Sequence, residues 1–161
     1  MSFYQVIPEC YADTLLVEIL GFKRPNHQLG IGKVLAMFKE KMKNRKAVGI
    51  IDDDKIKPRQ LDQFSLKEEK DGIKLLTNGH HAILIITPAF ENWIYQNAKQ
   101  VDLDPAKFGF PGAKKFREVC KRQDAKDNQE LKQFLNALKQ KKAAGLERLY
   151  TLICQCGEID L

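Results

Sequence analysis

The sequence has few cysteines, and their spacing excludes several kinds of protein. The four cysteines, at positions 10, 120, 154 and 156, form no Cys-x-x-Cys motif and no disulfide framework, so we expect reduced thiols and no zinc finger. No apolar run approaches the roughly 18 residues of a membrane span. The N-terminus also lacks the basic segment and apolar stretch of a signal peptide. We therefore expect a soluble, cytoplasmic protein without a membrane partner.

Positive charge is absent from the beginning of the chain and concentrated elsewhere. Residues 1–22 contain Glu9, Asp13 and Glu18 but no Lys or Arg, although the whole chain has 27 Lys+Arg against 21 Asp+Glu and a formal net charge of +6. The basic residues gather in the segments 33–46 and 107–150. An acidic focus with basic flanks suits a site that binds a metal ion and receives a phosphate backbone. Solvated Lys-rich helix faces are the alternative interpretation of the same pattern.

The hydrophobic pattern predicts an α/β fold. The 161 residues suit one domain. Alternating strands and helices favour a mainly parallel sheet flanked by helices, although Asp71-Gly72 between two short strands predicts a hairpin. Strands are expected at 3–8, 47–51, 64–69, 73–77 and 82–87, and helices at 12–20, 34–43, 89–100, 113–122, 128–142 and 146–153.

Three consecutive aspartates follow the second of these strands. The apolar run Gly49-Ile50-Ile51 ends in Asp52-Asp53-Asp54. In an extended chain successive side chains point to opposite faces, so Asp52 and Asp54 share one face and Asp53 takes the other. Neighbouring carboxylates repel unless a cation such as Mg²⁺ lies between them. Taken alone, the run is also typical of a solvated turn.

Two further carboxylates follow other strands, and this favours a shared site. Glu9 comes after the first strand, and Glu91 comes just after the strand that ends before Pro88. Ligands of parallel sheets bind beyond the carboxyl ends of the strands. We therefore expect Glu9, Asp52, Asp54 and Glu91 to converge at one edge of the sheet as a metal site.

A strand ending in Glu, a helix, and a later strand ending in Asp-x-Asp is similar to the layout of the Toprim domain. This family includes domains of topoisomerases, DnaG-type primases and OLD-type nucleases. The resemblance covers roughly the first hundred residues, with Val6-Ile7-Pro8-Glu9 and Ile50-Ile51-Asp52-Asp53-Asp54 as its two motifs. The stretch 87–93 also resembles the Pro-x-x-Glu-x-Trp segment of small Toprim proteins related to defence nucleases. One departure is Cys10, where family members usually have Gly after the Glu.

The resemblance implies a fold, a cofactor and roles for particular residues. It implies a single Toprim-like (Rossmann-like) domain over 1–161, with a core at about 1–104 and a helical C-terminal extension at about 105–161. In this family Asp52 and Asp54 would coordinate Mg²⁺ or Mn²⁺, and Glu9 would be a further ligand or the general acid/base at a phosphodiester. Glu91 has two open interpretations, as an additional metal carboxylate or as a favourable charge in the first turn of a helix.

Basic residues are candidates for contacts with a phosphate backbone. Lys33 follows Gly30-Ile31-Gly32 at a helix start, which is not a Walker A loop but suits a phosphate. Lys114, Lys115 and Arg117 follow a Gly/Pro-rich loop. A turn at Lys33 and an exposed helix face at the other three remain alternatives.

The function expected from the sequence is a metal-dependent nucleic-acid phosphodiesterase. Hydrolysis is favoured over nucleotidyl transfer, because the accessory domains of a primase or topoisomerase are absent from this sequence. Family analogy adds a role as a subunit or effector of a defence or repair system, with a protein partner. The alternative is a non-catalytic nucleic-acid- or protein-binding module that has kept the fold. A phosphoacceptor domain fits less well, because its acidic pair would have to follow the first strand.

Overall fold

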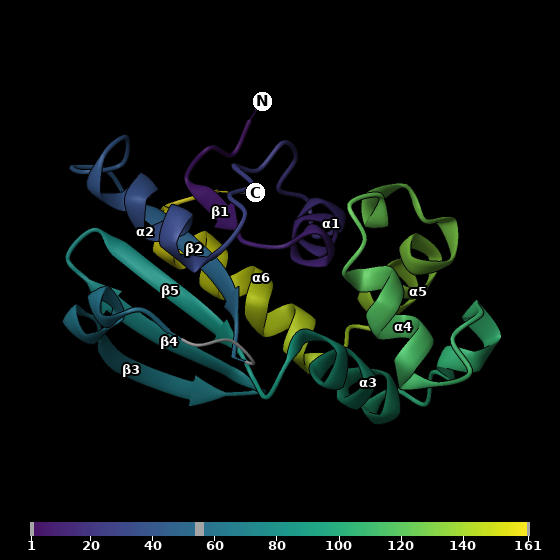
Figure 1. Ribbon diagram of the computed structural model, residues 1–161. Helices are drawn as coiled ribbons and strands as arrows, with labels where there is room; N and C mark the ends of the chain where they lie inside the picture. The colour runs from purple at the N-terminus through teal and green to yellow at the C-terminus, as the bar shows by residue number, and fades with distance from the viewer. Residues whose placement is uncertain (1, 54–56, 161) are drawn as a thin grey trace.

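The computed structural model describes residues 2–53 and 57–160 and has a five-stranded sheet with helices on both faces (Figure 1). The strands are β1 (Val6–Pro8), β2 (Ala47–Asp52), β3 (Ser65–Lys70), β4 (Ile73–Asn78) and β5 (His81–Ile86). The α-helices are α1 (Tyr11–Ile19), α2 (Ile31–Lys39), α3 (Phe90–Gln100), α4 (Ala113–Cys120), α5 (Gln129–Gln140) and α6 (Ala144–Gly157). Short 3₁₀ helices are η1 (Arg59–Gln63), η2 (Pro105–Phe108) and η3 (Ala125–Asp127).

The sheet is mixed, so the prediction of a mainly parallel sheet was wrong. Its strand order is β1-β2-β5-β4-β3, in which β1, β2 and β5 are parallel and the β5–β4 and β4–β3 pairs are antiparallel. The two-residue turn Asp71-Gly72 reverses the chain between β3 and β4, as predicted, with φ of 53° and 74°. The second strand of the hairpin, β4, then pairs antiparallel with β5. The branched apolar residues of β5 suit a parallel and an antiparallel neighbour equally well, so they do not indicate the orientation of that neighbour.

Side-chain alternation along the strands divides the core into two clusters. Val48, Ile50 and Leu84 face the larger cluster, which is formed with α1 and α3–α6, whereas Ile51 and Ile83 face a smaller cluster formed with α2. Successive residues of a strand point to opposite faces, so each parallel strand contributes to both clusters. The sheet is therefore covered on both faces, more deeply on the first than on the second.

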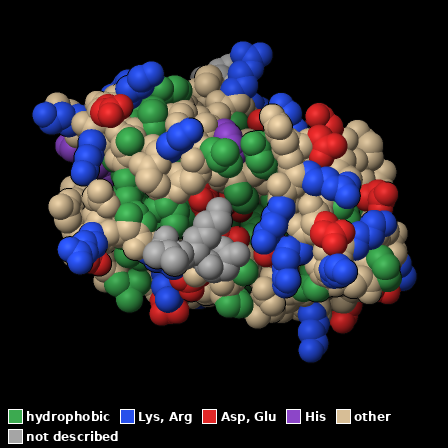
Figure 2. All heavy atoms as spheres, in the orientation of Figure 1, with side chains coloured by type: hydrophobic (Ala, Val, Ile, Leu, Met, Phe, Trp, Pro, Cys, Tyr) green, Lys and Arg blue, Asp and Glu red, His purple; other side chains and the backbone are tan. Residues whose placement is uncertain are grey.

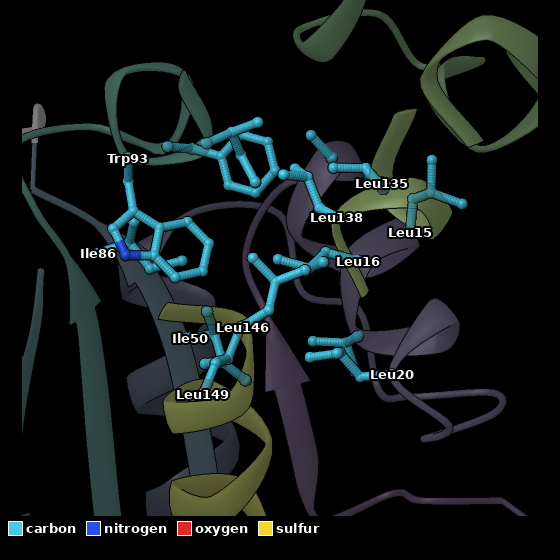
Figure 3. Close-up of a cluster of buried hydrophobic side chains, with 14 of the residues drawn as sticks. Leu15, Leu16, Leu20, Ile50, Ile86, Trp93, Leu135, Leu138, Leu146 and Leu149 are labelled. Carbon is cyan, nitrogen blue, oxygen red and sulfur yellow. The ribbon is translucent and has the colours of Figure 1, made fainter. Parts of the chain in front are cut away.

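The C-terminal helices pack into the larger cluster. Leu146 and Leu149 of α6 lie against Ile50 of β2, and Leu138 of α5 approaches Leu16 of α1 in the same cluster (Figure 3). Burying a leucine contributes roughly 1.5–3 kcal/mol, so these contacts hold the segment 129–157 firmly to the first face.

The hairpin turn is held by the start of α3. Trp93 is buried, and its indole N–H donates to the Asp71 carbonyl at 2.9 Å. A side chain at Gly72 would meet the Trp93 ring at 2.5 Å, so this position needs glycine for space as well as for its positive φ. This contact fixes α3 relative to the sheet and thereby positions the residues that follow β5.

Among residues 2–53 and 57–160, no helix is long and apolar enough to cross a membrane.

Candidate functional site

Two buried carboxylates come from the ends of adjacent parallel strands. Glu9 directly follows β1 and Asp52 ends β2, and the two strands pair in parallel with Pro8 opposite Ile50. The Asp52 backbone N–H donates to Glu9 Oε1 at 3.3 Å. Glu9 is 0 % exposed and Asp52 only 6 %. Parallel pairing thus brings together two carboxylates that are far apart in the sequence.

The start of α3 orients Asp52. The Phe90 N–H, in the first turn of this helix, donates to Asp52 Oδ1 at 2.9 Å. The first N–H groups of a helix lack partners within the helix and carry partial positive charge, so a carboxylate there is stabilised. Glu91 is the next residue of the same turn and is 6 % exposed. The carboxyl edge of the sheet therefore collects Glu9, Asp52 and Glu91.

Asp52 and Glu91 open into a cavity of about 290 Å³. Figure 2 shows acidic atoms in a hollow near the centre of the molecule, with Lys and Arg side chains along one rim. Glu9 is fully buried and does not line this cavity. The lining comes from α1, the loop before α2, β2, α3 and the end of α4: Cys10, Tyr11, Ala12, Leu29, Asp52, Phe90, Glu91, Cys120 and Lys121.

Cys10 follows Glu9 at the position where the Toprim resemblance leads to an expectation of Gly, and the backbone there does not need glycine. Its φ of −127° and ψ of 171° are ordinary for any residue. Its sulfur accepts the Asp13 N–H at 3.5 Å and so caps α1. Burial, followed by the charge of Asp13, raises the pKa of the Cys10 thiol well above its ordinary value. The cysteine is thus a neutral helix cap that leaves Glu9 at the end of β1.

The remaining aspartates of the run differ from Asp52. Asp53 lies on the opposite face, as alternation predicts, and its carboxylate pairs with Lys57 at 2.7 Å and Lys74 at 3.9 Å. It lines a different cavity, together with Leu61 and Leu66. Asp54, the predicted partner of Asp52, lies outside the described residues.

The predicted basic residues occupy different places. Lys33 is exposed in the first turn of α2. Gly30, the residue before this helix, donates its N–H to the Glu9 carbonyl at 3.4 Å. Lys114 and Lys115 are exposed on α4, and Arg117 of the same helix lines a larger cavity that also includes Glu91. α4 therefore brings one predicted cation to the neighbourhood of a predicted carboxylate.

Sequence reasoning missed Cys120 and Lys121 as parts of this site. Both line the cavity with Asp52 and Glu91. Burial, followed by the negative charge of Glu91 and other nearby carboxylates, raises the pKa of the Cys120 thiol well above its ordinary value. The spacing of Arg117 and Lys121, four residues apart on a helix, indicates one basic helix face, but it does not indicate which surface that face approaches.

The donor set fits a hard divalent ion that keeps part of its water shell. Among the described residues no group of three or more His, Cys, Asp or Glu side chains is arranged to hold a metal ion. Mg²⁺, however, is usually bound through one or two carboxylates, several waters and the phosphates of a substrate. Asp52 and Glu91, which line one cavity, are oxygen donors of this kind, with Glu9 directly behind Asp52.

Comparisons of the chain with protein-family models, with curated proteins and with solved structures gave no match.

Proposed function

We propose that this protein is a Mg²⁺- or Mn²⁺-dependent nucleic-acid phosphodiesterase with a Toprim-like active site. The observation that carries the proposal is the meeting of Glu9 and Asp52 at the ends of two adjacent parallel strands, beside a cavity that Asp52 lines together with Glu91. Backbone N–H groups of β2 and α3 donate to the Glu9 and Asp52 carboxylates, and a divalent cation at the cavity would add positive charge beside them and polarise a phosphoryl oxygen.

The roles of the carboxylates follow from their exposure. Asp52 and Glu91 reach the cavity and would hold the ion there, together with Asp54 if the family pattern applies. Glu9 is fully buried and accepts the Asp52 N–H, so its first role is to orient the end of β2. A role for Glu9 as a ligand or as a general acid/base needs access through the cavity that Asp52 lines.

The basic end of α4 supports a polyanionic substrate. Lys121 lines the acidic cavity, Arg117 lines the adjoining one, and Lys114 and Lys115 are exposed on the same helix. A carboxylate-bound cation flanked by Lys and Arg matches a phosphodiester, whose charge must be neutralised while its backbone is held.

A specific observation favours a second candidate, a non-catalytic nucleic-acid-binding module. Asp52 accepts the first N–H of α3 and Glu9 accepts the Asp52 N–H, so both carboxylates also stabilise the fold. In such a module the acidic edge would have only this structural role, and the basic face of α4 would bind nucleic acid without turnover.

The experiment that separates the two candidates measures cleavage of single- and double-stranded DNA and RNA with Mn²⁺, with Mg²⁺ and with EDTA. We expect metal-dependent cleavage by the wild type and a loss of about 10²–10³-fold in Asp52→Asn, comparable to removing one charge-stabilising group from an active site. Asp53→Asn is the matched control, because it removes the same charge at the next residue on the other face of the sheet; it should retain activity.

Two outcomes contradict the proposal. One is cleavage by Asp52→Asn at the wild-type rate, and the other is nucleic-acid binding by a folded wild type without cleavage under any of these conditions. The second outcome favours the binding module. Circular dichroism of each variant distinguishes a loss of activity from a loss of folding.

A further inference from the structure

A second cavity, of about 660 Å³, adjoins the acidic site and shares Glu91 with it. One wall is the face of α3 that carries Glu91, Tyr95 and Lys99 at intervals of one helical turn. The opposite wall consists of η2, the loop after it and the start of α4. From Glu91 to Lys99 the helix rises about 12 Å, so the cavity extends away from the acidic site along α3.

Part of the wall of this cavity is apolar and closely packed. Tyr95 is half-buried, and its hydroxyl donates to the Phe110 carbonyl at 3.4 Å. Its ring packs against Phe116 with the centroids 5.1 Å apart. Leu103 and Pro105 complete the apolar surface. An aromatic ring held on two sides is a preformed surface for stacking, because little conformational entropy is lost when a flat ligand packs on it.

The polar groups of the cavity suit the edge of a base and a single phosphate. The amides of Asn92 and Gln96 line the α3 wall, and each offers both a donor and an acceptor. Arg117 lies on the α4 wall, whereas at the other end of α3 one cation, Lys99, is accompanied by two carboxylates, Asp102 and Asp104. The excess negative charge at that end opposes a polyanion along the whole cavity. The charge distribution therefore favours one phosphate near Glu91 and Arg117, with an uncharged ring further in.

We propose that this cavity binds the base of an unpaired nucleotide next to the phosphodiester that is held at the acidic site. The inference rests on the proposed function and adds its substrate class, a single-stranded nucleic acid or a single-stranded end. A volume of 660 Å³ lies in the usual range for small-molecule sites, and a base stacked in a duplex does not reach such a cavity.

The test fills the cavity without changing the carboxylates. Ala106 of η2 is exposed and lines the cavity, so Ala106→Trp places a large ring in it. Gln133→Trp is the matched control, because Gln133 is exposed on α5 and lines a separate surface hollow with Asn136. Binding of a fluorescently labelled single-stranded DNA is measured by anisotropy with Ca²⁺ in place of Mg²⁺, so that a divalent cation stays at the carboxylates, and a gel checks that the strand is intact. Thermal unfolding checks that both variants fold.

We expect Ala106→Trp to weaken binding of the single strand by about 10-fold, the effect of losing one stacked base, and Gln133→Trp to leave it unchanged. A 2-aminopurine in the strand should lose fluorescence on binding to the wild type and keep it with Ala106→Trp. Equal affinity of Ala106→Trp and wild type, or unchanged 2-aminopurine fluorescence, overturns the inference.

The base-binding cavity and the proposed function can be contradicted independently of each other. If Asp52→Asn abolishes cleavage but Ala106→Trp binds single strands normally, the nuclease proposal stands and the base cavity is wrong. If the wild type never cleaves but Ala106→Trp binds the single strand more weakly than the wild type does, the base cavity stands as part of a binding module.

Discussion

Asp52 and Asp53 are adjacent in the sequence, yet the two faces of the sheet give them different surroundings. Asp52 faces the side covered by α1 and α3–α6, where it is buried and accepts a helix N–H beside Glu9 and Glu91. Asp53 faces the other side, where Lys57 and Lys74 pair with it.

The difference shows that the placement of an acidic residue on a strand decides its chemistry. On the Asp53 face two lysines from nearby elements neutralise the carboxylate, which makes a surface ion pair. On the Asp52 face parallel strand pairing collects carboxylates, and the flanking cations of α4 lie at the rim of the cavity. We therefore propose that the first face carries the function and that the Asp53 ion pairs on the second face stabilise the fold only locally.

The largest expected effect concerns the core of the first face. Leu149→Ala removes a buried side chain that packs between α6 and β2, and we expect it to lower the free energy of unfolding by about 2–5 kcal/mol. Leu66→Ala, on the Asp53 side, changes a residue that is 58 % exposed and should cost no more than about 0.5 kcal/mol. Urea denaturation measures both. Similar losses in the two variants would show that Leu66 is packed as deeply as Leu149.

The next effect is stabilisation by metal. At a Mn²⁺ concentration about 100 times its Kd, binding to the folded state adds about 2.7 kcal/mol, which raises Tm by roughly 5–10 °C in a chain of this size. Asp52→Asn should lose this shift and Asp53→Asn should keep it. Differential scanning calorimetry with and without Mn²⁺ checks the result. A shift that disappears only in Asp53→Asn would reverse the assignment of the faces.

The third effect is the salt dependence of nucleic-acid binding. Arg117→Gln/Lys121→Gln removes two cations beside the acidic site, so log K against log salt for a single strand should become shallower by about 0.7 for each lost phosphate contact. Lys57→Gln/Lys74→Gln removes two cations that already pair with Asp53 and should leave the slope unchanged. An equal change of slope in the second pair of substitutions would show that the cations on both faces contact the nucleic acid to the same extent.

The smallest effect is the contribution of the Asp53 ion pairs. The three side chains are between 24 and 33 % exposed, so Asp53→Asn should lower the free energy of unfolding by only about 0.2–1 kcal/mol, and less at high salt. Urea denaturation at low and high NaCl measures this. A loss above 2 kcal/mol that salt does not reduce would show that Asp53 is as deeply integrated as Asp52.

Much of the local structure could be predicted because it depends on local patterns. The apolar run before Asp52, the strand before Pro88 and the Asp71-Gly72 turn are all present within one or two residues of their expected positions. The opposite placement of Asp52 and Asp53 also follows from alternation alone. The orientation of β4 against β5 was not predictable in the same way, because a buried strand pairs equally well with parallel and antiparallel neighbours.

The outer part of the site depends on tertiary packing, which the sequence pattern does not encode. Cys120 and Lys121 reach the cavity because Phe116 and Val119 anchor α4 in the core. Tyr95 lines the second cavity because α3 presents it opposite η2. Helix periodicity identifies these faces as apolar or basic, but it does not identify the element opposite each face.

A crystal structure with Mn²⁺ soaked in, with the ion located by anomalous scattering, would show whether the acidic edge of the sheet binds a metal ion. We expect a Mn²⁺ peak in the cavity lined by Asp52 and Glu91, at the carboxyl ends of β1 and β2. A peak at Asp53 with none in that cavity, or no bound Mn²⁺ at this edge of the sheet, would contradict this expectation.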